Sequence, residues 1–373
     1  MRINSIQLRK VLDSRTNFTV EAEINGHSGK APSGASTGRY EAKCFLPDDL
    51  EGIEQELQQL ENEVLDQKEF DRKLEEIDGT DDFSRLGAVA IASSLAFKQA
   101  SGFTHGKEFP LPLGNVIGGG EHGGNTSIQE FLVLPVNAET FPEAVETNSK
   151  IYREMKDEYS HRIKGMNDEG ALITSMDDEQ TLKALKKVAD RHDARIGLDV
   201  AANEFYSDGK YHLDSLRQKF SPEEHLDFVK HLIENYNLVY VEDAFHEDDF
   251  RMHAKLTREY PDVMICGDDL FTTSSERLQE GIDNGACNSL IVKPNQIGTV
   301  TETWRTVKLA EEENYTPVIS HRSGETCDTS ISDLALEWNC PVIKAGVSDI
   351  RIAKLNRLLK LWDKTQNPEL YRP

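Results

Sequence analysis

The sequence has few cysteines, and they form no recognisable pairs. Its 373 residues include five, an odd number, and no CxxC motif occurs among them. Scattered cysteines in an odd number disfavour both a disulfide framework and a thiolate zinc site. We therefore expect reduced thiols in a cytoplasmic protein. The five cysteines are Cys44, Cys266, Cys287, Cys327 and Cys340.

Long hydrophobic runs are also absent. The longest nearly apolar stretch, LGAVAIASSLAF, is rich in small residues and falls short of the ~20 apolar residues that a membrane-spanning helix requires. The first residues, MRINSIQLRKVLDSR, lack the apolar core of a signal peptide. Both observations predict a chain without a membrane segment and with a cytoplasmic location.

Positive charge is the third shortage. The chain carries 66 acidic and 42 basic residues, and its formal net charge is -24. Such a field repels phosphate backbones, which makes nucleic acid an unexpected direct partner, and it disfavours anionic membrane surfaces. What is present is an ordinary globular composition, with 38% hydrophobic residues, 25 glycines and 13 prolines. A chain of this length can bury a large core as one big domain or two.

Residues 1–108 are predicted to form an N-terminal α+β domain, an antiparallel sheet with helices. The stretches INSIQLRKVLDS and FTVEAEING have strand composition. From Leu50 to Ile77, apolar residues recur at helical spacing on a charged background, and SRLGAVAIASSLAFKQA predicts a second, more buried helix. The segment SGFTHGKEFPLP is expected to be a linker.

After about Phe109 the pattern changes to short apolar runs separated by amphipathic helices. One such helix opens with a capping box at Ser221 and Glu224. Eight buried strands with helices between them predict a closed barrel over residues 109–373. The first two runs are separated only by GGGEHGG, too short for a helix, so we expect the barrel to open with a hairpin. The runs are PLGNVIGGG, EFLVLPV, IGLDVAANEF, LVYVEDAF, VMICGDDLF, SLIVKPNQI, TPVISHRSG and PVIKAG.

Charged or polar side chains close six successive runs at their C-terminal side. Barrel enzymes build their sites on this rim, because the strand ends converge there. Each residue alone has a structural interpretation as a turn residue, a cap or a satisfied histidine; Asp243, Asp248 and Asp249, for example, are expected to cap the next helix. The ordered series nevertheless indicates a site, because caps have no reason to place carboxylates first and lysines later. The six are Asp199, Glu242, Asp268, Lys293, His321 and Lys344.

The three carboxylates of this series predict a magnesium site. Asp199, Glu242 and Asp268 supply hard oxygens, and the lack of a histidine or cysteine among them disfavours zinc. A cation beside Lys293 disfavours the charged amine, so its pKa is expected to fall toward that of a useful base. Lys344 then provides a fixed positive charge or a second base. This chemistry is the abstraction of a proton alpha to a carboxylate.

Motifs along almost the whole chain resemble the enolase family. They include APSGASTGRYEA, GNVIGGGEHGGNTSIQEFLVLPV, VYVEDAFHEDDF, LIVKPNQIGTVTET and SHRSGETCDTSISDLAL, in family order. The resemblance implies an N-terminal α+β domain followed by a (β/α)8 barrel that begins with a ββ hairpin. It also implies a lyase that interconverts 2-phosphoglycerate with phosphoenolpyruvate and water. The superfamily pairing of a lysine or histidine base with one or two Mg²⁺ ions is a general precedent.

The resemblance implies a role for each candidate residue. Lys293 removes the C2 proton, and Glu169, paired with Glu130, protonates the departing C3 hydroxyl. Two Mg²⁺ ions are implied, the second bound by Ser36 together with the substrate phosphate. Arg322 and Ser323 hold that phosphate. Asp199, Glu242 and Asp268 hold the first ion, His122, His321 and Gln129 line the pocket, and Lys344 steadies the substrate carboxylate.

Several segments differ from the family pattern. Asn167 and Ala171 are substitutions beside Glu169, and SDIR follows the last strand where the family has RSER. Some of the altered segments lie at the family's dimer interface, so a homo-oligomer is possible rather than implied. Two alternatives stay open: a paralogue acting on a related phospho or phosphono acid, such as an enzyme forming carboxyphosphonoenolpyruvate, and a non-catalytic binding or scaffold protein.

Overall fold

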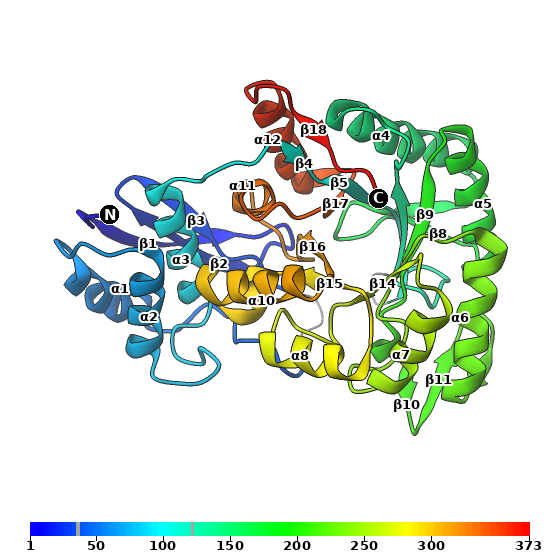
Figure 1. The fold of residues 1–373 in the computed structure, drawn as a ribbon, viewed down its shortest axis with the longest axis horizontal. Coiled ribbons are helices and arrows are strands. Elements are labelled where there is room, and N and C mark those ends of the chain that lie inside the picture. The colour runs from blue at the N-terminus through cyan, green and yellow to red at the C-terminus, as the bar shows by residue number, and fades with distance from the viewer. Residues whose placement is uncertain (35–37, 121–122) are drawn as a thin grey trace.

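The computed structural model describes residues 1–34, 38–120 and 123–373. A small sheet with helices forms one end of the molecule, and a barrel ringed by helices forms the other (Figure 1). The small sheet is antiparallel with the order β1-β2-β3. Alternation on β2 explains its packing, because Val20, Ala22 and Ile24 are fully buried. The three strands are β1 (Ile6–Leu12), β2 (Phe18–Ile24) and β3 (His27–Lys30).

The helical stretch predicted from Leu50 to Ile77 is divided into two helices by a short connection. Asp66 starts the second of them with a capping box, in which its side chain accepts from the amide of Glu69 and Glu69 accepts from the amide of Asp66. The spacing of apolar residues continues across the break, so periodicity alone does not reveal it. The elements are α1 (Leu50–Leu57), η1 (Gln58–Leu60), α2 (Gln67–Asp78) and α3 (Ala88–Ser101).

Small residues let α3 approach the sheet closely. A Cβ atom at Gly29 of β3 would lie 2.4 Å from the amide nitrogen of Ala96 and 2.5 Å from the carbonyl oxygen of Ala92. Ten consecutive residues of α3, from Ala88 to Phe97, are buried. The apolar run that is too short for a membrane is therefore the centre of the N-terminal core.

The eight predicted strands form a closed barrel. β5 pairs in parallel with the last strand, β17, which closes the sheet. β6 is antiparallel to both of its neighbours, β5 and β9, so the expected opening hairpin is confirmed. The strands are β5 (Leu111–Gly118), β6 (Glu130–Leu134), β9 (Arg195–Asp199), β13 (Tyr240–Glu242), β14 (Met264–Gly267), β15 (Ser289–Val292), β16 (Thr316–Ser320) and β17 (Val342–Gly346).

Helices cover the outside of the barrel (Figure 1). The predicted capping box at Ser221 and Glu224 is present at the start of α6. The helices are α4 (Phe141–Glu158), α5 (Asp178–Arg191), α6 (Pro222–Tyr236), α7 (Phe250–Glu259), α8 (Ser275–Asn284), α9 (Pro294–Ile297), α10 (Val300–Glu312), α11 (Ser330–Glu337) and α12 (Ile352–Trp362). Within the described ranges, we find no helix with the length and apolar character needed to cross a membrane.

Shorter elements decorate the barrel. β8 pairs with the end of β5, so β7 and β8 extend the sheet beyond the closed ring. β4 and β18 bring the end of the chain back to the start of the barrel. The predicted domain boundary at residue 108 falls at β4 and stays a prediction. These elements are β4 (Glu108–Phe109), β7 (Ile163–Met166), β8 (Leu172–Thr174), η3 (Ala202–Phe205), β10 (Tyr206–Ser207), β11 (Lys210–Leu213), β12 (Gln218–Phe220), η4 (Asp349–Arg351) and β18 (Glu369–Leu370).

Candidate active site

Three carboxylates form one row across adjacent strands of the barrel. Glu130 of β6 is the register partner of Asp199 of β9, and Asp199 is the partner of Glu242 of β13. Nζ of Lys344, at the far side of the ring on β17, lies 2.8 Å from Asp199 Oδ2 and 2.8 Å from Glu242 Oε2. The same nitrogen lies 3.2 Å from Glu130 Oε2. The barrel therefore directs one buried ammonium group onto three buried carboxylates.

A second ion pair lies at the ends of the next two strands. Lys293 follows β15, and its Nζ contacts Asp268, which follows β14. The other oxygen of Asp268 accepts from Nε2 of Gln296 at 2.9 Å. The rim of the barrel thus holds both predicted lysines in direct contact with predicted metal ligands.

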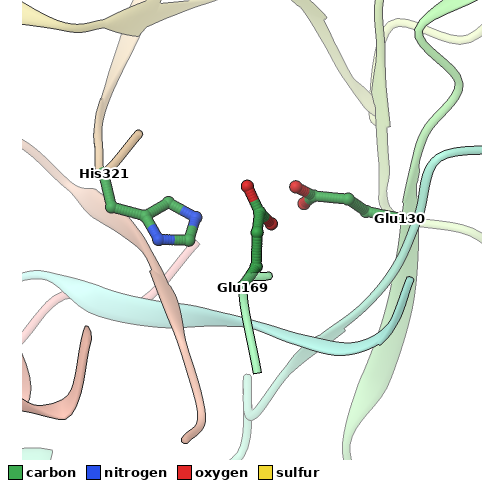
Figure 2. A group of neighbouring side chains, drawn as sticks. All are labelled: Glu130, Glu169 and His321. Carbon is green, nitrogen blue, oxygen red and sulfur yellow. The ribbon is translucent and has the colours of Figure 1, made fainter. Parts of the chain in front are cut away.

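The loop between β7 and β8 carries Glu169. Oδ1 of Asn167 accepts from the amides of Glu169 (3.0 Å) and Ala171 (2.8 Å), which fixes a tight turn. Asn115 of β5 donates to Glu169 Oε2 at 3.0 Å. Figure 2 shows the Glu169 carboxyl group between the ring of His321 and the carboxyl group of Glu130. Asn167, which differs from the family pattern, therefore stabilises the loop that carries Glu169.

The loop after β16 carries His321, Arg322 and Ser323. Nη1 of Arg322 donates to Glu41 Oε2 at 2.8 Å and lies 3.4 Å from Asn295 Oδ1. Glu41 comes from the N-terminal part of the chain, and its other oxygen accepts from the amide of Gly38 at 3.0 Å. The residues predicted to bind the phosphate are therefore held by contacts between the barrel and the N-terminal part of the chain.

One cavity collects the predicted residues. Among those that the structure describes, all but Glu242 line it, and Glu242 contacts Lys344 at its base. A larger cavity of about 590 Å³ beside the hairpin β11–β12 holds no predicted site residue in the described ranges. The small cavity is lined by Gln129, Glu130, Glu169, Asp199, Asp268, Lys293, His321, Arg322, Ser323 and Lys344, together with Gly34, Glu41, Asp269 and Ser320.

Burial and mutual repulsion raise the proton affinity of two rim carboxylates, Glu242 and Glu130. Burial, followed by the charge of Asp199, raises the pKa of Glu242 to about 8 although Lys344 opposes the shift. Burial raises the pKa of Glu130 well above its usual range, and Glu169 and Asp199 add to the effect. Burial would lower the pKa of Lys344, but Asp199 and Glu130 outweigh it and keep the pKa well above normal. Glu242 and Glu130 therefore bind a proton more readily than an exposed carboxyl group does.

The expected fall in the pKa of Lys293 does not occur in this structure. Burial favours the neutral amine, but the neighbouring charge of Asp268 outweighs burial and raises the pKa of Lys293. The reciprocal effect is seen on Asp268: burial opposes ionisation, but Lys293 holds its pKa below the usual value. The expectation assumed a cation beside the amine, and here the nearest charge is the carboxylate.

His321 is a neutral group in this setting. Burial lowers the pKa of its imidazole well below 6.5, despite the opposing charge of Glu169. Its Nδ1 has no hydrogen-bond partner among the described residues. A neutral ring beside Glu169 and Glu130 can accept or donate a hydrogen bond without adding charge.

Carboxylate groups suited to a cation are present near the rim. One ligand atom from each of Asp243, Asp268 and Asp269 lies within 4.8 Å of the others, and the same holds for Glu130, Glu169 and His321. The three predicted metal ligands do not form such a group in the described part of the chain. Asp199 and Glu242 contact Lys344, whereas Asp268 contacts Lys293. The group of Asp243, Asp268 and Asp269 offers carboxylate oxygens alone, which fits a hard divalent cation.

The predicted caps were partly wrong. Asp249 caps α7 by accepting from the amide of Met252. Asp243 instead accepts from the amides of Asp268 and Asp269, at 2.8 Å each. The structure also reveals supporting residues that the sequence did not single out: Glu41, Asn115, Gln296 and Arg351. Their only sequence signal is their place inside, or next to, stretches that resemble the family.

Two predicted residues lie outside the described ranges. Ser36, expected to bind the second metal ion and the phosphate, and His122, expected to line the pocket, are not described by the structure. Their proposed roles therefore continue to rest on the resemblance alone.

Comparisons with known proteins identify the family. The family model described as the enolase C-terminal TIM barrel domain matches residues 107–372, and that of the enolase N-terminal domain matches residues 3–111. The chain is 46% identical to an enolase of Natronomonas pharaonis, over 96% of this chain and 98% of that protein. It is 41% identical to an enolase of Archaeoglobus fulgidus, over 99% of each chain, and 43% identical to one of Halorubrum lacusprofundi, over 97% of this chain and 99% of that protein. The chain belongs to the enolase family.

Proposed function

We propose that the protein is a phosphopyruvate hydratase, a carbon–oxygen lyase that interconverts 2-phospho-D-glycerate with phosphoenolpyruvate and water. The observation that carries the proposal is the single cavity lined by both Lys293, which follows β15, and Glu169, which lies in the loop between β7 and β8. Full-length relatives named enolase support it further. A proton acceptor and a proton donor on opposite sides of one substrate suit an elimination.

The residues divide the reaction between them. Nζ of Lys293 accepts the C2 proton, and the electron pair left on C2 expels the C3 hydroxyl as Glu169 protonates it. Burial, and after it the charge of Glu169, raises the pKa of Glu130, so the Glu130 carboxyl can hold a proton beside Glu169. Arg322 and Ser323 bind the phosphate, Lys344 steadies the carboxylate, and His321 and Gln129 complete the wall. His122 joins them by resemblance.

The site is proposed to hold two Mg²⁺ ions. Asp199, Glu242 and Asp268 would hold the first, and Ser36 would help to hold the second. Bound magnesium would supply positive charge that neutralises the substrate carboxylate and favours the neutral amine of Lys293. The excess of buried carboxylates over lysines on the rim supports this assignment. A cytoplasmic location and a homo-oligomeric state stay predictions.

Turnover tests the proposal directly. Purified protein with Mg²⁺ and 2-phosphoglycerate should produce the ultraviolet absorbance of phosphoenolpyruvate. C2 proton exchange without turnover would favour the paralogue acting on a related acid. The absence of both turnover and Mg²⁺-dependent ligand binding would favour the non-catalytic scaffold and end the proposal.

Two substitutions test the division of roles. Lys293→Ala should abolish C2 exchange and reduce turnover by about 10²–10⁴-fold, because it removes the proton acceptor. Glu169→Gln should stop dehydration but spare exchange, because the base remains. Matched surface controls are Lys308→Ala and Glu312→Gln, an exposed pair on α10, which should leave both rates unchanged. Equal loss of exchange in both site variants would refute the assignment.

A further inference from the structure

Arg351 is a buried cation that the proposed chemistry does not use. It is 0% exposed and is among the largest fully buried side chains of the protein. Among the described residues it forms an ion pair with Asp349, at 3.3 Å, and that carboxylate is half exposed. Burying a guanidinium with so little direct compensation is costly. Its remaining contacts explain why it lies there.

The guanidinium donates to backbone carbonyls of two separate loops. Nη1 donates to the carbonyl oxygen of Asp168 at 3.3 Å, in the loop that carries Glu169. Nη2 donates to the carbonyl oxygens of Arg322, at 3.2 Å, and Ser323. One planar group therefore spans the loop with the proposed acid and the loop with the proposed phosphate ligands.

The chain around Arg351 is shaped for this contact. A Cβ atom at Gly346 would lie 2.6 Å from Cδ of Arg351 and 3.3 Å from the carbonyl oxygen of Glu169, so the glycine leaves room for both. Oγ of Ser348 donates to the carbonyl oxygen of Gly170 at 2.5 Å. The segment 346–351 thus holds the Glu169 loop at two carbonyls, those of Asp168 and Gly170, on either side of Glu169.

We propose that Arg351 is a positioning residue that fixes the distance between the Glu169 loop and the Arg322–Ser323 loop. This inference deepens the proposed function and rests on it for the roles of those two loops. The guanidinium suits the task, because its rigid fork of donors can bind several carbonyls at fixed angles, whereas an ammonium group cannot. It touches no reacting atom and acts through the backbone that it binds.

Kinetics of two variants distinguish positioning from general support of the fold. Arg351→Met keeps an apolar stem of similar length and removes the donors to both loops. We expect kcat to fall on the order of 10²-fold and KM for 2-phosphoglycerate to rise, while C2 proton exchange is largely retained because Lys293 is untouched. Ser348→Ala releases only the Glu169 loop. It should lower kcat by about tenfold with KM unchanged, and it keeps the inference testable if Arg351→Met fails to fold.

Asp349→Asn is the matched control. It removes the ionic partner of Arg351 and leaves the three carbonyl contacts, and asparagine tolerates the positive φ of 61° at this position. We expect near wild-type kcat and KM. Equal losses in Asp349→Asn and Arg351→Met, or equal losses of exchange and dehydration in Arg351→Met, would overturn the inference.

Amide hydrogen exchange separates this inference from the proposed function. Arg351→Met should speed exchange at residues 168–171 and at 323–324, whereas Asp349→Asn should not. This readout needs no turnover. If amide exchange in both segments of Arg351→Met is unchanged, the positioning role is overturned, whether or not the protein is an active enzyme. If the wild-type protein is inactive but Arg351→Met shows the expected amide exchange, only the proposed reaction is overturned.

Discussion

Lys344 concentrates the electrostatics of the site in one side chain. The residue is 2% exposed, and its ammonium group contacts Glu130, Asp199 and Glu242. Removing one partner of a buried ionic group leaves the others without compensation, which is much more costly than losing a surface pair. The lysine therefore stabilises the metal-free protein as well as serving the proposed reaction.

Lys344→Met tests this role in stability. We expect the free energy of unfolding, measured in urea without divalent cations, to fall by about 3–5 kcal/mol. The matched control is Lys308→Met, which breaks an exposed pair with Glu312 at 3.7 Å and should leave the unfolding midpoint unchanged. A loss no greater than that of the control would contradict the assignment of Lys344 as the main counter-charge of the rim.

At the scale of elements, α6 and α7 each bury a histidine that forms no ion pair with another described residue. His225 of α6 stacks on Tyr211 with ring centroids 4.1 Å apart, and His253 of α7 meets Phe245 edge-on at 5.2 Å. Nε2 of His225 pairs with the carbonyl oxygen of Ala244 at 2.9 Å. Burial lowers the pKa of each imidazole to about 4. Both rings are therefore neutral at pH 7.

This burial predicts a loss of stability in acid. Because the pKa is about 6.5 unfolded and about 4 folded, the unfolded chain binds protons first as the pH falls. The free energy of unfolding should therefore decrease between about pH 6.5 and pH 4, by about 3 kcal/mol for each histidine. Urea unfolding at several pH values measures it. His225→Phe should flatten the slope; an unchanged slope would exclude His225 as a source.

Sequence reasoning succeeded best for the barrel. Strands buried on both faces appear as near-continuous apolar runs, so all eight were predicted, and the short GGGEHGG connection predicted the hairpin. The break before Asp66 was missed because the apolar spacing continues across it. The role of Asp243 was also predicted wrongly: it was expected to cap the next helix, but it accepts from backbone amides of a neighbouring loop.

The supporting contacts of the site could not be predicted, because they join distant parts of the chain. Glu41 and Arg322 lie 281 positions apart, and the backbone oxygens bound by Arg351 have no side-chain signature. The raised pKa of Lys293 was missed for a related reason: it depends on the contact with Asp268 rather than on residue order. The residues at the rim can be predicted from the sequence, because they follow the predicted strands. Their hydrogen-bond and ion-pair partners can be identified only from the three-dimensional structure.

The molecule as a whole carries a net charge of -24. Such self-repulsion destabilises the compact state and is weakened by salt, because the Debye length falls to ~10 Å at 0.1 M ionic strength. Many of its acidic residues are exposed, including Asp262, Glu280 and Glu313, for which no ion pair is found in the described structure. Screening should therefore stabilise the protein.

A charge-reversal variant tests the effect on the whole molecule. Raising KCl from about 0.05 M to about 0.5 M should raise the Tm of the wild type by about 2 °C or more. Asp262→Lys/Glu280→Lys/Glu313→Lys, which removes two units of negative charge at each position, should have a higher Tm at low salt and respond less to KCl. The same salt response in both proteins, measured by differential scanning fluorimetry, would argue against net charge as the cause.

The reversed direction of β6 has a consequence for how this barrel can change. In an all-parallel barrel, the residue that begins a strand faces the end opposite the site. Because β6 is antiparallel to β5 and β9, its first residue, Glu130, lies level with Asp199, the last residue of β9. Insertions or deletions between β5 and β6 would therefore fall at the end of the barrel that holds the candidate site, and not at the opposite, structural end.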